Sequence, residues 1–228
     1  MTSSSARSAP AEIVAMLLAD ARLPVAGHTQ SAGLEPALAD GMEPADVPVY
    51  LELRLATVTA IEAGTAVVAL HHLRAGHDLA SVVEAWTART PSPALREVAR
   101  HQGRALLRLL VRLWPHEPAI AAVADLPAAP RAVVLAAAAQ AGALRPITLA
   151  RIVGYDDVQT VVAAALKLTP MDPADATAWV LDAAPEIEAM AERVATLTDP
   201  DRIPRIGSPQ IEAWAQAHAV STRRLFRA

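Results

Sequence analysis

Cysteine is absent from the 228-residue sequence, and glycine and aromatic residues are scarce, with nine glycines, four tryptophans, two tyrosines and one phenylalanine. The lack of cysteine excludes disulfides, thiolate zinc sites and a cysteine nucleophile, and it is compatible with the cytoplasmic location that we expect. Few stretches alternate β-branched or aromatic residues with polar ones, which argues against a β-sheet protein.

Two apolar runs, 132–144 and 146–170, do not have the properties of a membrane span. The first residues, MTSSSARSAPAE, have no apolar core of the kind found in signal peptides. The run 132–144 is too short for a bilayer, and four charged residues interrupt the longer run 146–170. We therefore expect no membrane association. The net charge of −4 likewise gives no electrostatic support for nucleic-acid binding.

Alanine, in contrast, is abundant, and the sequence contains 53 of them. Alanine is the best helix former because it loses no side-chain entropy in a helix. The 18 prolines are expected to mark breaks between successive helices. The composition therefore predicts an all-α fold, a single-domain helical bundle of about ten helices with short loops.

Apolar spacing, prolines and glycines set the expected boundaries. Residues 1–10 are expected to form a disordered tail, 11–219 the helical domain, and 220–228 a basic tail that docks onto a partner. The proline-rich stretch 115–130 is expected to be an irregular, flexible loop. The expected helices cover 11–22, 31–41, 46–74, 79–89, 93–113, 131–143, 146–154, 157–169, 173–197 and 209–219.

Polar residues just before several helices are expected to cap them. Ser92 precedes Pro93, and proline is favoured at the first helical position. Ser31, Asp78 and Ser208 occupy similar places. The spacing also predicts two apolar faces: Ile13, Met16 and Leu17 on the first helix, and Leu95, Val98, Leu106, Leu109 and Leu113 on the helix 93–113.

Charge is unevenly distributed along the chain. A basic stripe recurs every four residues at Arg96, Arg100, Arg104, Arg108 and Arg112. The segment 171–202 contains eight carboxylates and two arginines. Three interpretations stay open: these are solvated faces, they dock onto a partner, or they pair with each other inside the chain, where each exposed pair would add little stability.

Residues 23–35 combine a proline and a glycine, a polar cluster and the start of a helix. One interpretation is structural, with Ser31 as the cap and Glu35 favoured by the helix dipole. The segment also resembles the pattern LP-x-G-G-F-x-H-S-G-G-L-E of the urease accessory protein family UreF. It matches that pattern at Leu23, Pro24, Gly27, Ser31, Gly33, Leu34 and Glu35. It departs from it at Ala26, His28, Gln30 and Ala32, where the family usually has glycine, an aromatic residue, histidine and glycine, respectively.

Three further stretches resemble the same family in order and spacing. Residues 96–107 resemble its R-E…G-R-x-L-L helix. Residues 164–171 resemble its A-x-R-L-x-P-L-G-Q segment, with Lys167 in place of arginine and Asp172-Pro173 in place of the Gly-Gln pair. Residues 218–228 resemble its H-E…R-L-F-R-S ending, with Ala219 in place of glutamate.

The resemblance implies a helical scaffold that dimerises and has no cofactor, no metal site and no turnover of its own. Such a protein binds the accessory protein called UreD or UreH, and together they recruit the GTPase UreG, which delivers nickel to apo-urease. The sequence has no G-x-x-x-x-G-K-[ST] phosphate loop and no G-x-S-x-G or H-E-x-x-H motif, so the GTPase chemistry belongs to a partner. The expected partner-binding residues are Gln30, Ser31, Glu35, Lys167, His218, Arg223, Arg224, Leu225, Phe226 and Arg227.

The only phenylalanine, Phe226, lies near the chain end and is flanked by Arg224 and Arg227. An aromatic anchor beside arginines suits a pocket on a partner, and the alternative is a tail that folds back on its own body. Lys167 lies among apolar neighbours. It is expected to reach solvent, to pair with Glu35 or an aspartate, or to face UreG.

Two other functions stay open. Imidazole is a common nickel ligand, so a direct nickel metallochaperone could use the histidines at one helix end, His71, His72 and His77. Basic residues are, however, also common at helix C-termini because of the dipole. The other possibility is a helical enzyme, which would need clustered titratable groups in a deep pocket, for example near Glu35, Tyr155 and Lys167.

Overall fold

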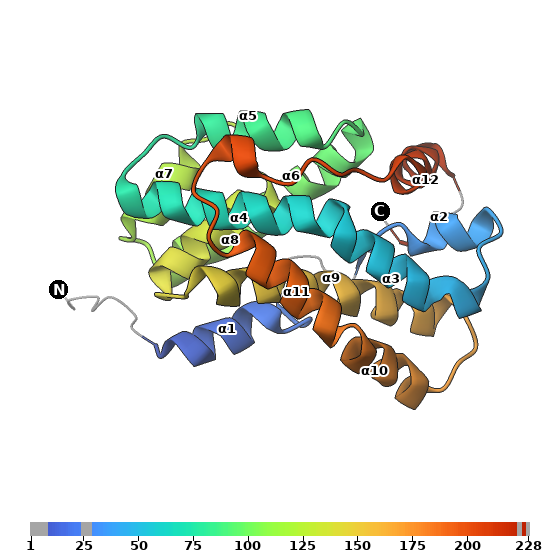
Figure 1. Ribbon diagram of the computed structural model, residues 1–228. Helices are drawn as coiled ribbons and strands as arrows, with labels where there is room; N and C mark the ends of the chain where they lie inside the picture. The colour runs from blue at the N-terminus through green and yellow to red at the C-terminus, as the bar shows by residue number, and fades with distance from the viewer. Residues whose placement is uncertain (1–8, 24–28, 223–224, 227–228) are drawn as a thin grey trace.

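The computed structural model describes residues 9–23, 29–222 and 225–226. In these residues all regular secondary structure is helical, and the expected all-α, single-domain fold is confirmed (Figure 1). The α-helices are α1 (Ala11–Ala19), α2 (Leu34–Ala39), α3 (Val47–Ala56), α4 (Val58–Ala75), α5 (Ala80–Arg89), α6 (Pro93–Leu113), α7 (Pro118–Ala124), α8 (Arg131–Ala141), α9 (Pro146–Leu168), α10 (Pro173–Asp182), α11 (Ala184–Val194) and α12 (Pro209–Val220). Two short 3-10 helices cover Pro44–Asp46 and Pro200–Arg202.

The core is built around α4, which runs through the middle of the molecule and packs against α8 and α9 (Figure 1). Residues 132–139 of α8 are buried on every side of that helix. A helix that is apolar all round belongs in a core. Because most of its buried residues are alanines, neighbouring backbones come close, and the alanine-rich composition therefore serves the packing of α4 against α8.

Gly103 in α6 marks a close approach of two backbones. A Cβ at this position would lie 2.4 Å from the carbonyl oxygen of Ala129, just before α8. No side chain fits into that space, so α6 and the start of α8 can meet in this way only at a glycine. Gly103 is also the glycine of the family-like stretch 96–107.

Two of the four expected helix caps are confirmed. Ser92 Oγ and Ser208 Oγ each accept the backbone N–H three residues ahead, at 3.4 and 3.5 Å. The prediction for Asp78 was wrong by one residue, because Leu79 occupies the N-cap position of α5, although Asp78 Oδ1 accepts the N–H of Ala80 at 3.0 Å. The prediction for Ser31 was wrong, because Gly33 occupies the N-cap position of α2 and Ser31 Oγ is buried without a hydrogen-bond partner.

Two expected helices are each divided in two, so their continuity was predicted wrongly. The helix expected at 46–74 breaks at Thr57, whose φ of −122° and ψ of −100° are not helical. The helix expected at 173–197 breaks at Ala183, two residues before Pro185 in the first turn of α11. Proline has no N–H to donate to the preceding turn, so it ends one helix while suiting the start of the next.

In two other places the structure is more helical than the sequence predicted. The two helices expected between 146 and 169 are one continuous helix, α9. Its Gly154 is a packing contact and not a break, since a Cβ there would lie 2.9 Å from Met190 Cε. The loop expected at 115–130 contains α7, which begins at Pro118 because proline is tolerated in the first helical turn.

The buried faces of two helices differ from the expected ones. In α1 the core residues are Val14 and Leu18, while Met16 of the expected face is 67% exposed. In α6 only Leu106 of the expected stripe is fully buried. The buried face of α6 consists of Ala99, Gly103, Ala105, Leu106 and Leu110. Small residues therefore face the core of α6 where leucines were expected.

The basic stripe is not paired with the acidic segment. Arg96 donates to two backbone carbonyls of the turn before α6, and Arg104 forms an ion pair with Glu97 at 2.8 Å. None of the ion pairs formed by the described residues joins this stripe to 171–202. The pairing inside the chain therefore finds no support, and a solvated face or a docking surface are the interpretations that stay open.

One stretch of the described chain, Pro44–Ala75, is long and apolar enough to cross a membrane. Of its most apolar window, 78% is buried inside the fold. Such burial is what the central helix of a packed core shows.

Candidate functional site

The C-terminal tail folds back onto the body of the protein. The carboxylate of Glu35, in the first turn of α2, accepts the backbone N–H groups of Leu225 and Phe226 at 2.5 and 3.0 Å. His218, near the end of α12, places Nε2 at 3.2 Å from the carbonyl oxygen of Phe226 and at 3.7 Å from Glu35. Because a carbonyl oxygen can only accept, this nitrogen carries the hydrogen and donates it. Helices α2 and α12 thus hold the tail backbone from two sides.

Leu225 and Phe226 differ sharply in exposure. The ring of Phe226 is 4% exposed, and Lys167 Nζ lies 5.1 Å from its centroid, within range of a cation–π interaction. Leu225 is 66% exposed. Phe226 therefore anchors the tail to its own body, and Leu225 faces outward.

This tail cluster gathers five residues that the sequence predicted for partner binding: Glu35, Lys167, His218, Leu225 and Phe226. They come from three of the four family-like stretches. The predicted residues Arg223, Arg224 and Arg227 lie outside the described residues. Of the two interpretations of Phe226, the isolated chain adopts the one in which the tail folds back. Docking of the tail onto a partner stays a prediction.

Gln30 and Ser31, which were also predicted to bind partners, are 5% and 0% exposed. Gln30 Oε1 and Ser31 Oγ are buried without a hydrogen-bond partner. Partner binding by these two residues stays a prediction, but in the isolated chain neither side chain is presented at the surface.

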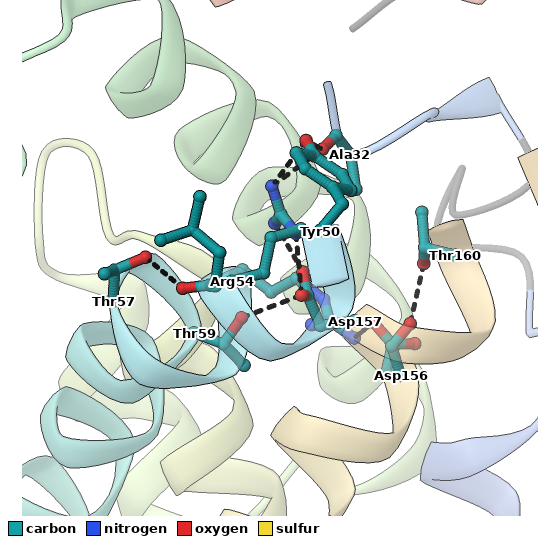
Figure 2. Close-up of polar contacts among 10 residues, drawn as sticks. Ala32, Tyr50, Arg54, Thr57, Thr59, Asp156, Asp157 and Thr160 are labelled. Carbon is teal, nitrogen blue, oxygen red and sulfur yellow. Dashed lines mark hydrogen bonds and ion pairs between the residues drawn. The ribbon is translucent and has the colours of Figure 1, made fainter. Parts of the chain in front are cut away.

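A buried charged network, which the sequence did not reveal, lies beside the turn before α2 (Figure 2). Arg54 of α3 forms a two-point ion pair with Asp157 of α9, with Nε–Oδ2 and Nη2–Oδ1 distances of 2.8 and 2.6 Å. Thr59, near the start of α4, donates to Asp157 Oδ2 at 2.7 Å. Arg54 Nη1 and the Tyr50 hydroxyl both donate to the carbonyl oxygen of Ala32, each at 2.7 Å. The network therefore joins α3, α4, α9 and the turn.

Ala32 has a φ of 51°, in the left-handed region that L-residues disfavour by about 1–2 kcal/mol. The next residue, Gly33, has a φ of 82°, and a Cβ there would lie 2.8 Å from the Tyr50 hydroxyl. The two successive glycines of the UreF pattern thus correspond to two successive left-handed residues. The departure from that pattern at Ala32 leaves a strained residue, which Arg54 and Tyr50 hold in place.

Two further carboxyl groups lie close to this network. Glu62 of α4 accepts the indole N–H of Trp86 at 2.6 Å, and Asp156 of α9 forms an ion pair with Arg131 of α8 at 3.1 Å. Burial raises the pKa of both carboxyl groups, because the charged form loses its hydration and the neighbouring donors offset only part of that loss.

The same groups line a cavity of about 340 Å³. Its polar lining includes Gln30, Glu62, Arg131, Asp156 and His218, and its apolar wall includes Val58, Leu95, Val98 and Leu135. His218 thus belongs both to the cavity and to the tail cluster. This is not the pocket expected for an enzyme, because the described residues that line it do not include Glu35, Lys167 or Tyr155.

The sequence held one indirect signal of these groups. Asp156 and Asp157 are two of the charged residues that interrupt the apolar run 146–170. Charged residues in such a helix are rarely buried unless paired, which predicts cations on neighbouring helices. No pattern in the sequence, however, identifies Arg54 or Arg131 as those cations.

Three histidine rings cluster near the end of α4, with centroids 5.5 to 6.3 Å apart. They belong to His71, His72 and His77, and His72 Nδ1 is hydrogen-bonded to the Asp78 carbonyl oxygen at 2.8 Å. Within the described part of the chain, no group of three or more histidine, aspartate or glutamate side chains is arranged to hold a metal ion. The metallochaperone alternative therefore gains no support from these histidines.

Comparison with known proteins gives the same family as the motifs in the sequence. The family model UreF matches residues 42–184. A protein of Mycolicibacterium vanbaalenii named urease accessory protein UreF is 34% identical over 217 residues, which cover 92% of this chain and 96% of that protein. Proteins of the same name from Mycobacterium sp. strain JLS and Mycobacterium tuberculosis are 36% and 33% identical. Those matches cover 92% and 93% of this chain and 96% and 97% of the two proteins, respectively.

Proposed function

This chain belongs to the UreF family of urease accessory proteins, and on that premise we propose that it is a non-catalytic scaffold of urease maturation. It binds the accessory protein UreD or UreH, and together they recruit the GTPase UreG for the insertion of nickel into apo-urease. We place it in the cytoplasm as a homodimer. Its work is to offer shaped helical surface to other proteins.

The observation that carries this proposal is the tail cluster. Stretches that are far apart in the sequence, around Glu35, Lys167 and His218, meet at the last residues of the chain. These stretches are the ones whose residues resemble the family. Lys167 and Leu225 of this cluster are exposed, and exposed residues suit recognition of another protein.

The surface chemistry of the tail supports the same proposal. Leu225 is 66% exposed, and Val220 at the end of α12 is 82% exposed. Three arginines flank Leu225 in the sequence. Exposed apolar side chains that have arginines beside them in the sequence suit a partner with an apolar pocket and an acidic rim, because hot spots are apolar or arginine-rich and rim charges steer association.

The ionic network, in contrast, has the character of a structural element. Arg54 and Asp157 satisfy each other at two points, and Thr59 and Ala32 occupy further hydrogen-bonding positions. Groups engaged in this way hold α3, α4 and α9 in position. This is consistent with a scaffold whose chemistry is carried out by UreG.

The proposal is tested by co-purification with UreD or UreH. We expect the double variant Arg224→Ala/Phe226→Ala to lose the complex while circular dichroism shows an unchanged helical content. A matched control is Arg202→Ala/Ile206→Ala, which removes an arginine and an exposed isoleucine from a different loop. This control should co-purify normally.

Two results would count against the proposal. Normal complex formation by the tail variant would remove the tail from the mechanism. Failure of the unmodified chain to bind UreD or UreH, and to bring down UreG with it, would refute the scaffold function itself. Analytical ultracentrifugation of the purified chain tests the homodimer separately.

A further inference from the structure

The cavity between α4, α6, α8 and α9 has features that the scaffold function does not use. Its volume of about 340 Å³ lies at the lower end of the range typical of small-molecule sites, roughly 300–1,000 Å³. Most of its lining residues belong to helices, and the turn around Gln30, Ala32 and Gly33 completes the wall. A site of this kind is already shaped before any ligand arrives.

One polar atom of a residue that lines the cavity has no hydrogen-bond partner. Gln30 is 5% exposed and lines the cavity, and its Oε1 forms no hydrogen bond. Its amide nitrogen donates to the hydroxyl of Thr29, at 3.4 Å. A buried carbonyl oxygen without a donor is unfavourable, so the position favours a ligand that supplies an N–H or O–H group.

The charge of the cavity wall indicates which donor fits. Among the described residues, five carboxylates and three guanidinium groups line the cavity, which leaves a formal charge of −2. Asp156 and Asp157 are already paired with arginines, whereas Glu62 has only the neutral indole of Trp86 as a close hydrogen-bond donor. Burial raises the pKa of Glu62, and the hydrogen bond from Trp86 and the charges of Arg131 and Arg54 offset only part of that effect.

The remaining wall is apolar. Val58, Leu95, Val98 and Leu135 face the cavity from α4, α6 and α8. A ligand that fills this volume therefore needs a hydrocarbon part as well as a charged end, since transfer of an apolar stem from water to such a wall is favourable. A bare or hydrated ion would make no favourable contact with this apolar wall.

We propose that this cavity binds a small organic cation that carries N–H donors on a short hydrocarbon stem. Its charged end lies between Glu62 and Gln30, and its stem lies along the apolar wall. A divalent metal ion fits less well, because no group of three or more metal-ligating side chains converges in the described part of the chain. The inference is independent of UreD, UreH and UreG, so it stands or falls separately from the scaffold function.

The test uses the full chain and two almost isosteric probes, N-butylguanidinium chloride and uncharged N-butylurea. Titration calorimetry should show saturable, one-to-one binding of N-butylguanidinium and at least tenfold weaker binding of N-butylurea. At ten times its Kd the cation should also raise the Tm by roughly 3–6 °C. No saturable binding below about 10 mM, or equal binding of the two probes, would overturn the proposal.

Two variants locate the site. Gln30→Met removes the unpartnered oxygen at similar volume, so it should leave the Tm of the free protein unchanged or higher and weaken the cation roughly fivefold or more. Glu62→Gln keeps an acceptor for Trp86 but loses the charge, and it should weaken the cation roughly tenfold or more. Gln210→Met, at an exposed glutamine away from the cavity, is the matched control.

Unchanged affinity in Gln30→Met and Glu62→Gln would place the cation elsewhere and refute the assignment. If Glu62→Gln failed to fold, Gln30→Met alone would decide the question. For that variant, the combination of retained stability and lost affinity cannot arise from a general loss of structure.

Discussion

Arg54 and Asp157 lie 103 residues apart in the sequence and form a two-point ion pair in the interior, with N–O distances of 2.8 and 2.6 Å. The side chain of Arg54 is 9% exposed and that of Asp157 is 18% exposed. The pair connects α3 to α9, and the remaining guanidinium nitrogen reaches the turn before α2 (Figure 2). One side chain thus fixes three segments relative to one another.

We expect Arg54→Met to lower the free energy of unfolding by about 3–5 kcal/mol, because it leaves Asp157 buried without its counter-ion. The matched control is Arg151→Met. Arg151 also forms a two-point ion pair, with Glu188, but both side chains are 41% exposed. Its loss should cost only about 0–1 kcal/mol. Urea unfolding followed by circular dichroism measures both values, and similar losses in the two variants would contradict the assigned role of burial.

The strained residue Ala32 leads to a prediction of opposite sign. Ala32→Gly should raise the free energy of unfolding by about 0.5–1 kcal/mol, because glycine adopts a positive φ without strain and this gain exceeds its extra chain entropy. Ala143 has a φ of 52° and should respond in the same way. Ala122→Gly, in an exposed position of α7, should instead cost about 1 kcal/mol. A loss of stability in Ala32→Gly would show that the residue is not strained.

Glu62 gives a prediction of pH dependence. Its pKa is raised in the folded protein above the ordinary value of 4.5. The associated stability is therefore fully present below the unfolded pKa and is lost as the pH rises through the folded one. Glu62→Gln cannot lose a proton, so it should be more stable than the unmodified chain near pH 8, and its advantage should shrink toward pH 4.

Urea midpoints of both proteins at the two pH values measure this difference. Asp156 also has a raised pKa, so a residual slope of the same sign should persist in the variant. A constant difference between the two proteins at all pH values would exclude titration of Glu62 as its cause.

The role of Glu35 in holding the tail can be tested by substitution. Gln at this position has one carbonyl oxygen for the two N–H groups of Leu225 and Phe226, so Glu35→Gln should release the tail more often. We expect trypsin to cleave after the tail arginines roughly tenfold faster, as the loss of one charge-assisted hydrogen bond predicts. Glu43→Gln, at an exposed glutamate, is the control. Equal cleavage rates in the two variants would mean that Glu35 does not hold the tail.

The sequence predicted those parts of the fold that depend on local chemistry. Ser92 and Ser208 cap helices as expected, because a hydroxyl three residues before an N–H acts within one turn. The break at Ala183 has a local signal in Pro185, because proline favours the first turn of a helix over its interior. The continuity of α9 through Gly154 had none, since that glycine is required by side chains of another helix.

The sequence likewise predicted only part of the candidate site. The family-like stretches identified Glu35, Lys167 and His218, but only the fold shows that they meet at Phe226. The expected apolar face of α1 was wrong because the spacing that places Val14 and Leu18 on one face also fits Ile13 and Leu17. Which face is buried depends on the neighbouring helix. The apolar periodicity of a sequence therefore predicts neither long-range residue pairs nor cavities.

The contact between Glu35 and Phe226 spans 191 residues, nearly the whole chain. During synthesis Glu35 emerges from the ribosome early, whereas Phe226 is made 191 residues later. The place beside Lys167 and His218 is therefore empty until Phe226 has left the ribosome. A chain that stalls or is cut before this residue differs from a longer one at the surface that we assign to UreD or UreH.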